Sequence, residues 1–360
     1  MNMLDHEQIA GNAHIAAVAV ATPPLSLQQT EAGRYLAERY SGALNSRSLS
    51  LMQSLFSNNA IRRRSFALEE PDDLFTEDLD GRIRRFTHWA VELSAEATEK
   101  ALVLAGAAPR DVSGLVVNTC TGYICPGIST YLLERLGLDR TIRVYDLVGS
   151  GCGGALPNIE VAESLLGRAP DKVVVSASAE ICTATFQMGN DLSLLVSNAL
   201  FGDGAAAAVL WRRTQGLQLI ASSSWYVPED RDAIRYVHKE GQLYNQLSTR
   251  LPHLVKKAVA QVLRDLLGPR NLRVADIKHW AFHTGGEKII NCIRDEIGLS
   301  EEQLLPTRSI LSAYGNMSSP TVWFVLNDIL DKGMDHGDFC VMVAFGAGLS
   351  AHAVLLKKHS

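Results

Sequence analysis

Short apolar runs rich in β-branched residues alternate along the chain with longer stretches of helical periodicity. The apolar runs predict buried strands at residues 114–118, 143–148, 172–177, 280–282 and 339–344. Amphipathic stretches with apolar residues at helical spacing lie between them, at residues 90–105, 156–166 and 253–267. This alternation is typical of an α/β protein in which helices pack on the faces of a sheet.

The sequence also contains an internal similarity. Asp111 opens the string Asp-Val-Ser-Gly-Leu-Val-Val-Asn-Thr-Cys-Thr-Gly, and 165 positions later Asp276 opens the similar string Asp-Ile-Lys-His-Trp-Ala-Phe-His-Thr-Gly. A second pair, Phe201-Gly-Asp-Gly and Phe345-Gly-Ala-Gly, is separated by 144 positions. We interpret these matches as two duplicated halves of like topology. The predicted domains are residues 1–213 and 214–360.

Composition narrows the class of protein. With 360 residues, of which 47% are hydrophobic and 20% charged, the chain is long enough to bury a large core. The formal net charge of -5 gives no broad basic field, so binding to nucleic acid is not expected. Apolar runs fall short of the roughly 18 residues of a membrane span, and residues 1–14 lack a signal-peptide pattern. The six cysteines contain no C-x-x-C pair, so we expect free thiols, no metal and a cytoplasmic location.

Cys152 lies where a nucleophile is expected. The predicted strand at 143–148 runs into Gly149-Ser-Gly-Cys152-Gly-Gly, and a helical stretch follows. Small residues on both sides allow a sharp turn and leave the sulfur approachable. A thiol at a helix N-terminus has its thiolate stabilised by the helix dipole, so the sequence predicts an activated thiolate here.

The repeat offset brings Asn316 into the same picture. Adding 165 positions to Cys152 leads to Gly-Asn316-Met-Ser-Ser-Pro at the start of a predicted helix. Equivalent helix ends face each other across the internal axis of a duplicated fold, so the thiol and the amide should share one site. His283 ends a buried strand before Thr-Gly-Gly, and strand ends are where open α/β sheets carry catalytic groups.

Each of these three residues also has a purely structural interpretation. A cysteine among glycines can be a packed small residue, an asparagine after glycine can cap a helix, and a histidine can simply belong to the core. Their agreement with the repeat offset favours a joint catalytic role.

At these residues the sequence resembles the type III polyketide synthases, the relatives of chalcone and stilbene synthases, over residues 11–358. The matching strings are Gly151-Cys152, Ala199-Leu-Phe-Gly-Asp-Gly-Ala, Phe282-His-Thr-Gly-Gly, Gly315-Asn-Met-Ser-Ser and Ala344-Phe-Gly-Ala-Gly-Leu. The bacterial branch is closer than the plant branch, because of the Cys120-Thr-Gly and His-Thr-Gly-Gly forms.

The resemblance implies a layered αβαβα thiolase-like fold, a homodimer, and no cofactor beyond the coenzyme A of the substrates. It implies that Cys152, paired with His283, takes an acyl starter from a CoA thioester. His283 and Asn316 then stabilise the enolate that forms when malonyl-CoA loses carbon dioxide. Repeated decarboxylative Claisen condensation, followed by cyclisation, would give a pyrone, resorcinol or phloroglucinol-type product.

The resemblance also assigns residues around the substrate. Phe201 matches the gate of the acyl tunnel, and its alternative role is core packing. The other positions matched to the substrate pocket are Thr185, Cys182, Cys120, Cys125, Tyr236, Asn245 and Ser318. Cys120 and Cys125 fall where the family's chain-elongation cavity is walled, although both could equally be buried small hydrophobes.

Several positions depart from the family pattern. Asn245 replaces the second gating aromatic residue, and Tyr236 occupies a position that is usually small. Ser54 and Asn58 replace the plant enzymes' CoA-binding cations, so Arg62, Arg63 and Arg64 become candidates to bind the CoA phosphates. An acyl carrier protein is therefore a further possible source of starters.

Other functions on the same scaffold stay open at this level. A ketoacyl synthase of the third kind shares the Cys-His-Asn set and condenses once. A non-condensing acyltransferase or thioesterase would release the acyl group from Cys152 to water or an alcohol. A catalytically silent partner subunit is a fourth possibility, which the presence of Cys152 disfavours.

Overall fold

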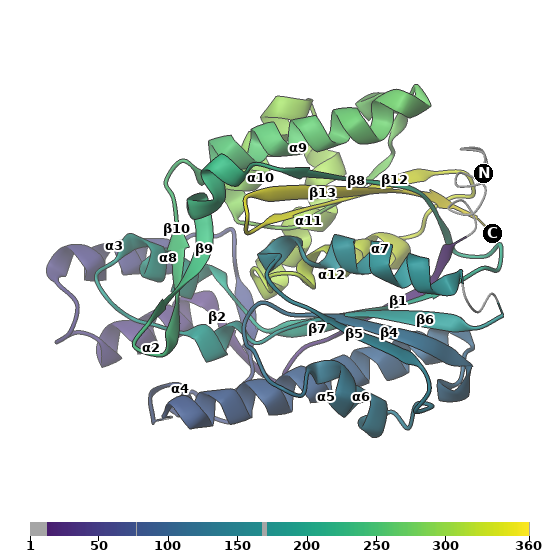
Figure 1. Ribbon diagram of the computed structural model, residues 1–360. Helices are drawn as coiled ribbons and strands as arrows, with labels where there is room; N and C mark the ends of the chain where they lie inside the picture. The colour runs from purple at the N-terminus through teal and green to yellow at the C-terminus, as the bar shows by residue number, and fades with distance from the viewer. Residues whose placement is uncertain (1–12, 77, 168–170, 360) are drawn as a thin grey trace.

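The computed structural model describes residues 13–76, 78–167 and 171–359. Nine strands form two large β-sheets that are joined at one edge and are separated and flanked by helices (Figure 1), and two further sheets have two strands each. The continuous strand order is β11-β12-β13-β8-β1-β7-β6-β4-β5. The two sheets join only at β1 and β8, where His14 pairs with Gln218 and Ile15 with Leu217.

The first sheet belongs to the N-terminal part of the chain. Its strands, in spatial order, are β1 (His14–Ala21), β7 (Gly204–Trp211), β6 (Val173–Glu180), β4 (Val112–Asn118) and β5 (Arg143–Leu147). The second sheet consists of β8 (Leu217–Tyr226), β13 (Ser350–Lys358), β12 (Phe339–Gly346) and β11 (His279–Phe282). Every residue of β6 and β7 is buried, which explains their continuous apolar and small-residue sequences.

The two sheets repeat one topology. The order β1-β7-β6-β4 has two antiparallel pairings followed by a parallel one, and β8-β13-β12-β11 has the same three. Helices α7 (Ala155–Leu166) and α12 (Thr321–Lys332) follow corresponding positions and have the same length of 12 residues. The predicted duplication is therefore confirmed. The chain passes from one sheet to the other between Trp211 and Leu217, and the boundary at residue 213 stays a prediction.

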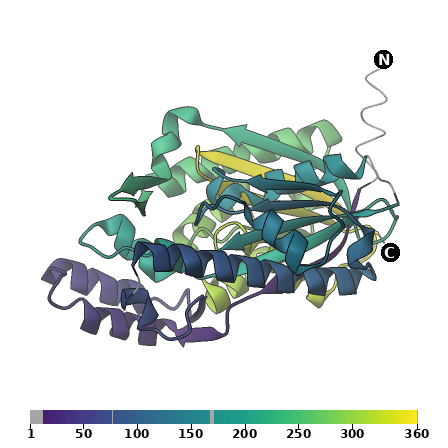
Figure 2. The ribbon, with the colours of Figure 1, turned by 60° about the horizontal axis from the view of Figure 1, so that its bottom comes forward.

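Helices form the other three layers. Helices α7 and α12 lie between the sheets and contact both of them (Figure 1). Helices α5 (Leu79–Ala105) and α6 (Ile128–Arg135) cover the outer face of the first sheet, as Figure 2 shows for α5. Helix α9 (Leu251–Leu267) covers the second, and α10 (Glu287–Ile297) packs against α9. This is the predicted αβαβα arrangement.

The five predicted strands correspond to β4, β5, β6, β11 and β12, and the predicted helices to α5, α7 and α9. The sequence analysis did not predict a smaller unit on one side of the layers (Figure 1). That unit contains β2 (Leu25–Gln28), α2 (Gln29–Arg39), α3 (Ser46–Phe56), β3 (Arg63–Phe66), α4 (Asp73–Thr76), α8 (Leu192–Leu200), β9 (Ile234–Lys239) and β10 (Gln242–Leu247). Its elements are short and come from separate parts of the chain, so local periodicity reveals little of it.

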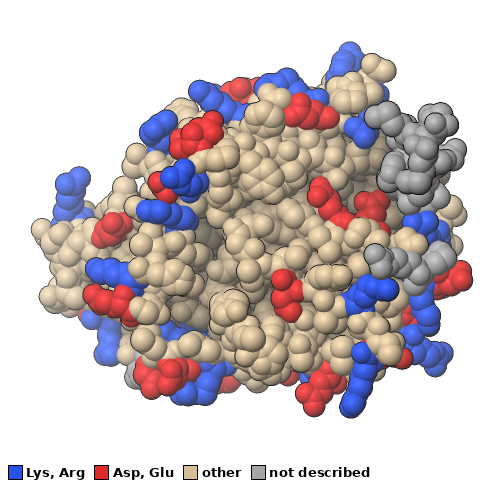
Figure 3. Space-filling model, viewed as in Figure 1, with Lys and Arg blue, Asp and Glu red and all other residues tan. Residues whose placement is uncertain are grey.

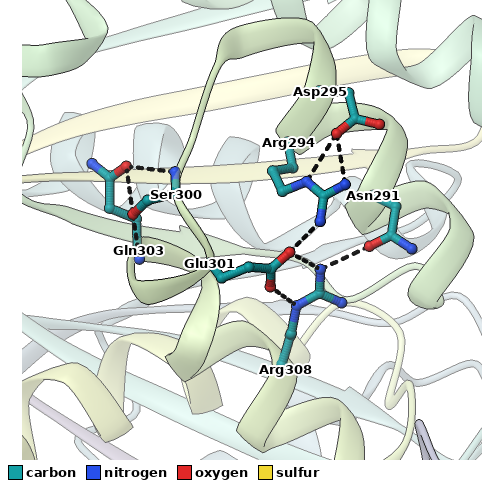
Figure 4. Close-up of polar contacts among 7 residues, drawn as sticks. All are labelled: Asn291, Arg294, Asp295, Ser300, Glu301, Gln303 and Arg308. Carbon is teal, nitrogen blue, oxygen red and sulfur yellow. Dashed lines mark hydrogen bonds and ion pairs between the residues drawn. The ribbon is translucent and has the colours of Figure 1, made fainter.

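A polar cluster joins α10 to α11 (Glu301–Tyr314) (Figure 4). Glu301 accepts from the guanidinium groups of Arg294 and Arg308 and thereby bridges the two helices. At the start of α11, Ser300 and Gln303 form a reciprocal capping box. Because α10 follows His283 and α11 precedes Asn316, this cluster fixes two elements that lead to candidate site residues.

The molecular surface carries charges of both signs. Figure 3 shows Lys and Arg interspersed with Asp and Glu around one face, with no basic field on that face. Within the described parts of the chain, none of the helices is long and apolar enough to cross a membrane.

Candidate active site

Cys152 lies in a tight turn between the two sheets. A 3₁₀ turn at Gly151–Gly153 connects β5 to α7, and Gly151 adopts a φ of +56° that favours glycine. The turn packs directly against the loop after β12: a Cβ placed on Gly346 would lie 2.4 Å from the Ser150 carbonyl oxygen. Gly346 of the Phe345-Gly-Ala-Gly string is therefore required here, because only glycine allows the nucleophile turn to approach this closely.

His283 and Asn316 reach the same region from the other half of the chain. His283 directly follows β11. Its backbone N–H donates to the Val343 carbonyl on β12 at 2.8 Å and so continues the pairing of the two strands. Asn316 lies between α11 and α12, and its backbone pairs with Phe201 in a short parallel bridge. His283, Asn316 and Cys152 are all buried.

Ser318 is the residue that contacts all three groups. Its hydroxyl donates to the Cys152 sulfur, with an Oγ–Sγ distance of 3.2 Å. Its backbone N–H donates to Oδ1 of Asn316 at 2.7 Å, and its backbone also hydrogen-bonds the His283 ring. Since Oδ1 of Asn316 accepts this bond, the amide NH₂ is the donor group left for a substrate. The structure thus brings the three predicted residues together around one serine.

Burial dominates the electrostatics of the thiol and the imidazole. Desolvation raises the pKa of Cys152; the Ser318 hydrogen bond opposes this rise and the Glu180 carboxylate adds to it. Desolvation lowers the pKa of His283 to about 3, and its ring packs edge-on against Phe345 at 5.0 Å. Burial therefore opposes the expected thiolate, which stays a prediction. The sulfur lies in a buried turn before α7, where desolvation opposes the stabilisation expected from the helix terminus.

Four of the predicted pocket residues line one apolar pocket beside the site. Phe201, Cys182, Thr185 and Asn245 border a pocket with about 750 Å³ of empty space, part of it open to solvent. The other walls come from α2, β3, α4 and α8. This pocket lies mainly within the smaller unit, which sequence periodicity did not reveal.

Tyr236 and Cys120 lie nearer to the nucleophile. The Tyr236 hydroxyl lies 3.4 Å from Oγ1 of Thr185. Burial raises its pKa well above the usual value, and the neighbouring thiols of Cys120 and Cys182 raise it further. The Cys120 sulfur lies 3.2 Å from the Ser318 hydroxyl, so this thiol also reaches the site.

Cys125 and Arg64 require corrections. Cys125 is exposed in the loop before α6, so it does not line the cavity within this chain. Arg64 is buried and donates to the carbonyls of Asn198 and Phe201. Its guanidinium is thus already used inside the protein and cannot reach a phosphate at the surface. Arg62 and Arg63 are exposed and remain candidates.

A second pocket lies close to Arg62. It has about 430 Å³ of empty space and is lined by residues that include Asn58, Leu200, Glu287 and Leu311. Arg62 adjoins it, because the Arg62 backbone N–H and Nε donate to the carbonyl and hydroxyl of Ser312 on α11. Leu200 connects this pocket to the site, since its carbonyl accepts from the Asn316 N–H at 2.9 Å.

Glu180 is the site residue whose importance the sequence analysis missed. It ends the fully buried strand β6, and an acidic residue at that place was the available signal. Its carboxylate accepts from Cys120, Thr121 and Ser319. Burial still raises its pKa, because these donors only partly offset desolvation.

The duplicated αβαβα architecture defines a thiolase-like protein, the class of fold used for condensing acyl transfer. Two family models match the chain: "FAE1/Type III polyketide synthase-like protein" over residues 31–220, and "Chalcone and stilbene synthases, C-terminal domain" over residues 218–359. The chain belongs to the type III polyketide synthase family. It is an acyltransferase that extends an acyl starter by decarboxylative condensation, as the resemblance predicted.

Individual relatives agree with this assignment. A 3,5-dihydroxyphenylacetyl-CoA synthase of Streptomyces toyocaensis is 31% identical over 85% of this chain and 82% of its own length. A 1,3,6,8-tetrahydroxynaphthalene synthase of Streptomyces peucetius subsp. caesius is 29% identical over 98% of this chain and 95% of its own length.

Solved structures show the same fold. PKS-I from the brown alga Ectocarpus siliculosus superposes with a TM-score of 0.89 and 25% identity, covering 97% of this chain and 99% of that one. The tetrahydroxynaphthalene synthase of Streptomyces coelicolor A3(2) superposes with a TM-score of 0.90 and 24% identity, covering 96% of this chain and 99% of that one.

Proposed function

We propose that Cys152 carries the acyl chain while His283 and Asn316 stabilise the enolate of the extender. The observation that carries this proposal is the convergence of the three side chains on Ser318. A buried, water-poor site strengthens hydrogen bonds to developing negative charge, and this stabilises an enolate oxygen.

The loading step follows from these positions. The Cys152 sulfur attacks the starter's thioester carbonyl, the bond from that carbonyl to the CoA sulfur breaks, and the thiol proton leaves with the CoA thiol. His283 is neutral and adjacent, so it accepts this proton transiently and passes it on.

The extension step uses the same groups. Malonyl-CoA loses carbon dioxide, and the electron pair of the broken C–C bond forms the thioester enolate. The Asn316 NH₂ and a His283 N–H donate to the enolate oxygen. The enolate carbon then attacks the acyl carbonyl on Cys152 and releases the sulfur, and reloading of the longer chain allows iteration.

For the product we propose a phenolic ring of the resorcinol type. Support comes from the relatives, which are named for 3,5-dihydroxyphenyl and polyhydroxynaphthalene products. The apolar pocket beyond Phe201 has room for a starter's tail or for the growing chain.

We further propose that substrates enter as CoA thioesters through the second pocket, with Arg62 and Arg63 beside the phosphates. An acyl carrier protein would present its phosphopantetheine at the same entrance. The proposed chemistry uses only the thioesters, the malonyl carboxylate and the side chains described above, so the proposal includes no metal or organic cofactor.

The proposed assembly is a cytoplasmic homodimer. Strand β5 is the free edge of its sheet, and such an edge offers unpaired backbone groups to a partner. Exposed large side chains lie on β5 at Tyr145 and directly after it at Val148, and Tyr123 is exposed in the loop after β4. This combination fits a second copy of the chain.

The test of the catalytic proposal is acyl loading. Purified wild type, Cys152→Ala and Cys120→Ala are incubated with malonyl-CoA and a panel of short, long and aromatic acyl-CoA starters, and their intact masses are measured. The wild type and Cys120→Ala should gain an acyl group, whereas Cys152→Ala should not. Acylation of Cys152→Ala would remove the proposed nucleophile. Mass spectrometry of the products that the wild type releases identifies the preferred starter.

A further inference from the structure

A continuous chain of buried hydrogen bonds runs from the first turn of α7 to Glu180, beside the nucleophile. Asn158 on α7 donates through Nδ2 to Oδ1 of Asn118 at 2.9 Å. Asn118, at the end of β4, donates through Nδ2 to the Ser319 hydroxyl at 2.8 Å. Ser319 donates to Oε1 of Glu180 at 2.5 Å. These four side chains are at most 3% exposed, so solvent does not compete for their bonds.

The direction of these bonds is determined by the groups present. Oδ1 of Asn118 accepts from Asn158 and from the Ser178 hydroxyl, at 2.9 and 2.6 Å, which turns its NH₂ towards Ser319. The Ser319 oxygen therefore accepts from Asn118. Its single proton is left for Glu180, and the short distance agrees with a hydroxyl donating to a carboxylate.

The Glu180 carboxylate is consequently well supplied with donors. Its Oε2 accepts from the backbone N–H groups of Cys120 and Thr121, at 2.9 and 3.1 Å, and from the Thr121 hydroxyl at 2.9 Å. Its Oε1 is occupied by Ser319. The Ser318 hydroxyl lies 3.4 Å from Oε1, which is long for a bond between two oxygens.

Ser318 thus has one proton and a choice of acceptors. Its hydroxyl lies 3.2 Å from the Cys152 sulfur and 3.2 Å from the Cys120 sulfur, which is short for contacts with the larger sulfur atom. The backbone of Ser318 adopts a φ of +59°, unusual for a residue other than glycine. This conformation is held from both sides, because its N–H donates to Asn316 and its carbonyl accepts from the Thr321 hydroxyl at 2.8 Å.

We propose that Ser318 is the hydrogen-bond donor that stabilises the Cys152 thiolate. In this proposal Ser319 and Asn118 are positioning residues: Ser319 occupies Oε1 of Glu180, so that the Ser318 hydroxyl stays directed at the sulfur. The inference rests on the proposed role of Cys152 as the nucleophile. It addresses which group besides His283 stabilises the sulfur when it ionises. When Ser319 is absent, Oε1 of Glu180 loses its donor and the Ser318 hydroxyl turns to the carboxylate.

The test measures ionisation of Cys152 and does not depend on turnover. Alkylation of the Cys152 peptide by iodoacetamide is followed by mass spectrometry as a function of pH, in the intact, folded protein. Ser318→Ala should raise the pH midpoint by about one to two units, the shift expected when a thiolate loses one charge-assisted bond. Ser318→Gly should give the same shift although glycine relieves the positive φ. A shift in the alanine variant alone would assign the effect to backbone strain and overturn the donor role.

Ser319→Ala tests the positioning role. It should also raise the midpoint, and the Ser318→Ala/Ser319→Ala double variant should equal Ser318→Ala alone, since both changes remove the same bond. Additive shifts, or an unchanged midpoint in Ser319→Ala, would overturn the relay.

Ser94→Ala is the matched control. Ser94 is fully buried on α5, and its hydroxyl has no hydrogen-bond partner among the described residues. The alkylation midpoint and the thermal unfolding of Ser94→Ala should therefore equal those of wild type. The acyl-loading assay with Cys152→Ala separates the two proposals. Loading without Cys152 would defeat the proposed function, whereas an unshifted midpoint with normal loading would defeat only the role of Ser318.

Discussion

Phe201 and Asn316 pair through their backbones, so the predicted gate and the predicted enolate donor are built on one bridge. The Asn316 N–H donates to the carbonyl of Leu200 at 2.9 Å, and the Gly202 N–H donates to the carbonyl of Asn316 at 3.0 Å. The Phe201 side chain takes no part in these bonds and lines the apolar pocket. Changes to that side chain should therefore alter the pocket without moving Asn316.

Phe201→Ala is expected to change the starter range or the product length while malonyl-CoA decarboxylation stays within about threefold of wild type, because one side-chain contact alters pocket shape and not the backbone bridge. Product masses and carbon dioxide release are the two measurements. Loss of decarboxylation together with an unchanged product profile would place Phe201 in the structural core instead.

Asn316→Ala and Asn316→Asp should lower malonyl-CoA decarboxylation by about 10²–10³-fold, the usual effect of removing one donor to a developing oxyanion, and should affect starter loading much less. Asp keeps an oxygen that accepts from the Ser318 N–H but loses the NH₂ donor. Near-normal decarboxylation by Asn316→Asp would therefore contradict the donor role.

The three neighbouring arginines should behave differently. Arg64→Ala leaves the buried carbonyls of Asn198 and Phe201 without their donor, so we expect a loss of about 3 kcal/mol or more in the free energy of unfolding. Arg62→Ala and Arg63→Ala should raise the KM for malonyl-CoA, more strongly at low salt, with unchanged unfolding. Urea titrations and KM values at two ionic strengths distinguish the two patterns.

His352 should make the fold sensitive to acid. Burial lowers its pKa to about 4, below the value of about 6.5 for an unfolded chain. Because its folded-state pKa is depressed, its contribution to stability is present above pH 6.5 and is lost as the pH falls towards 4. Between pH 7 and pH 5, His352→Gln should lose about 2 kcal/mol less unfolding free energy than wild type. Urea titrations at pH 7 and pH 5 measure the unfolding free energies. An equal loss in wild type and His352→Gln would contradict this linkage.

Val148→Asp should convert the proposed dimer to a monomer, because it places a charge beside the free edge of β5. Leu305→Asp is the matched control, since Leu305 is equally exposed at 57% and lies on α11, away from that strand. Light scattering after size-exclusion chromatography measures both. A dimeric Val148→Asp protein would show that this edge is not the interface.

Much of the layered fold was predictable from the sequence because its signals are local. The alternation of apolar runs and helical stretches predicted β4, β6, β12, α7 and α9, and the repeat offset predicted the two halves. The same offset related Cys152 to Asn316, because duplicated topology places corresponding helix starts opposite each other. Family membership followed from short strings that enclose these residues, and the comparisons confirmed it.

Tertiary structure alone decided properties that depend on residues distant in sequence. Arg62, Arg63 and Arg64 form one basic run, yet only Arg64 turns inward, where carbonyls from α8 and its C-terminal end surround it. A glycine-flanked thiol before a helix predicted a thiolate, but burial between two sheets raised its pKa. The sequence assigned Ser318 only to the substrate pocket, whereas the structure places its hydroxyl between two thiols and a carboxylate. Periodicity and motifs report on neighbours along the chain, whereas desolvation and hydrogen-bond direction depend on which distant groups fill the space around a side chain.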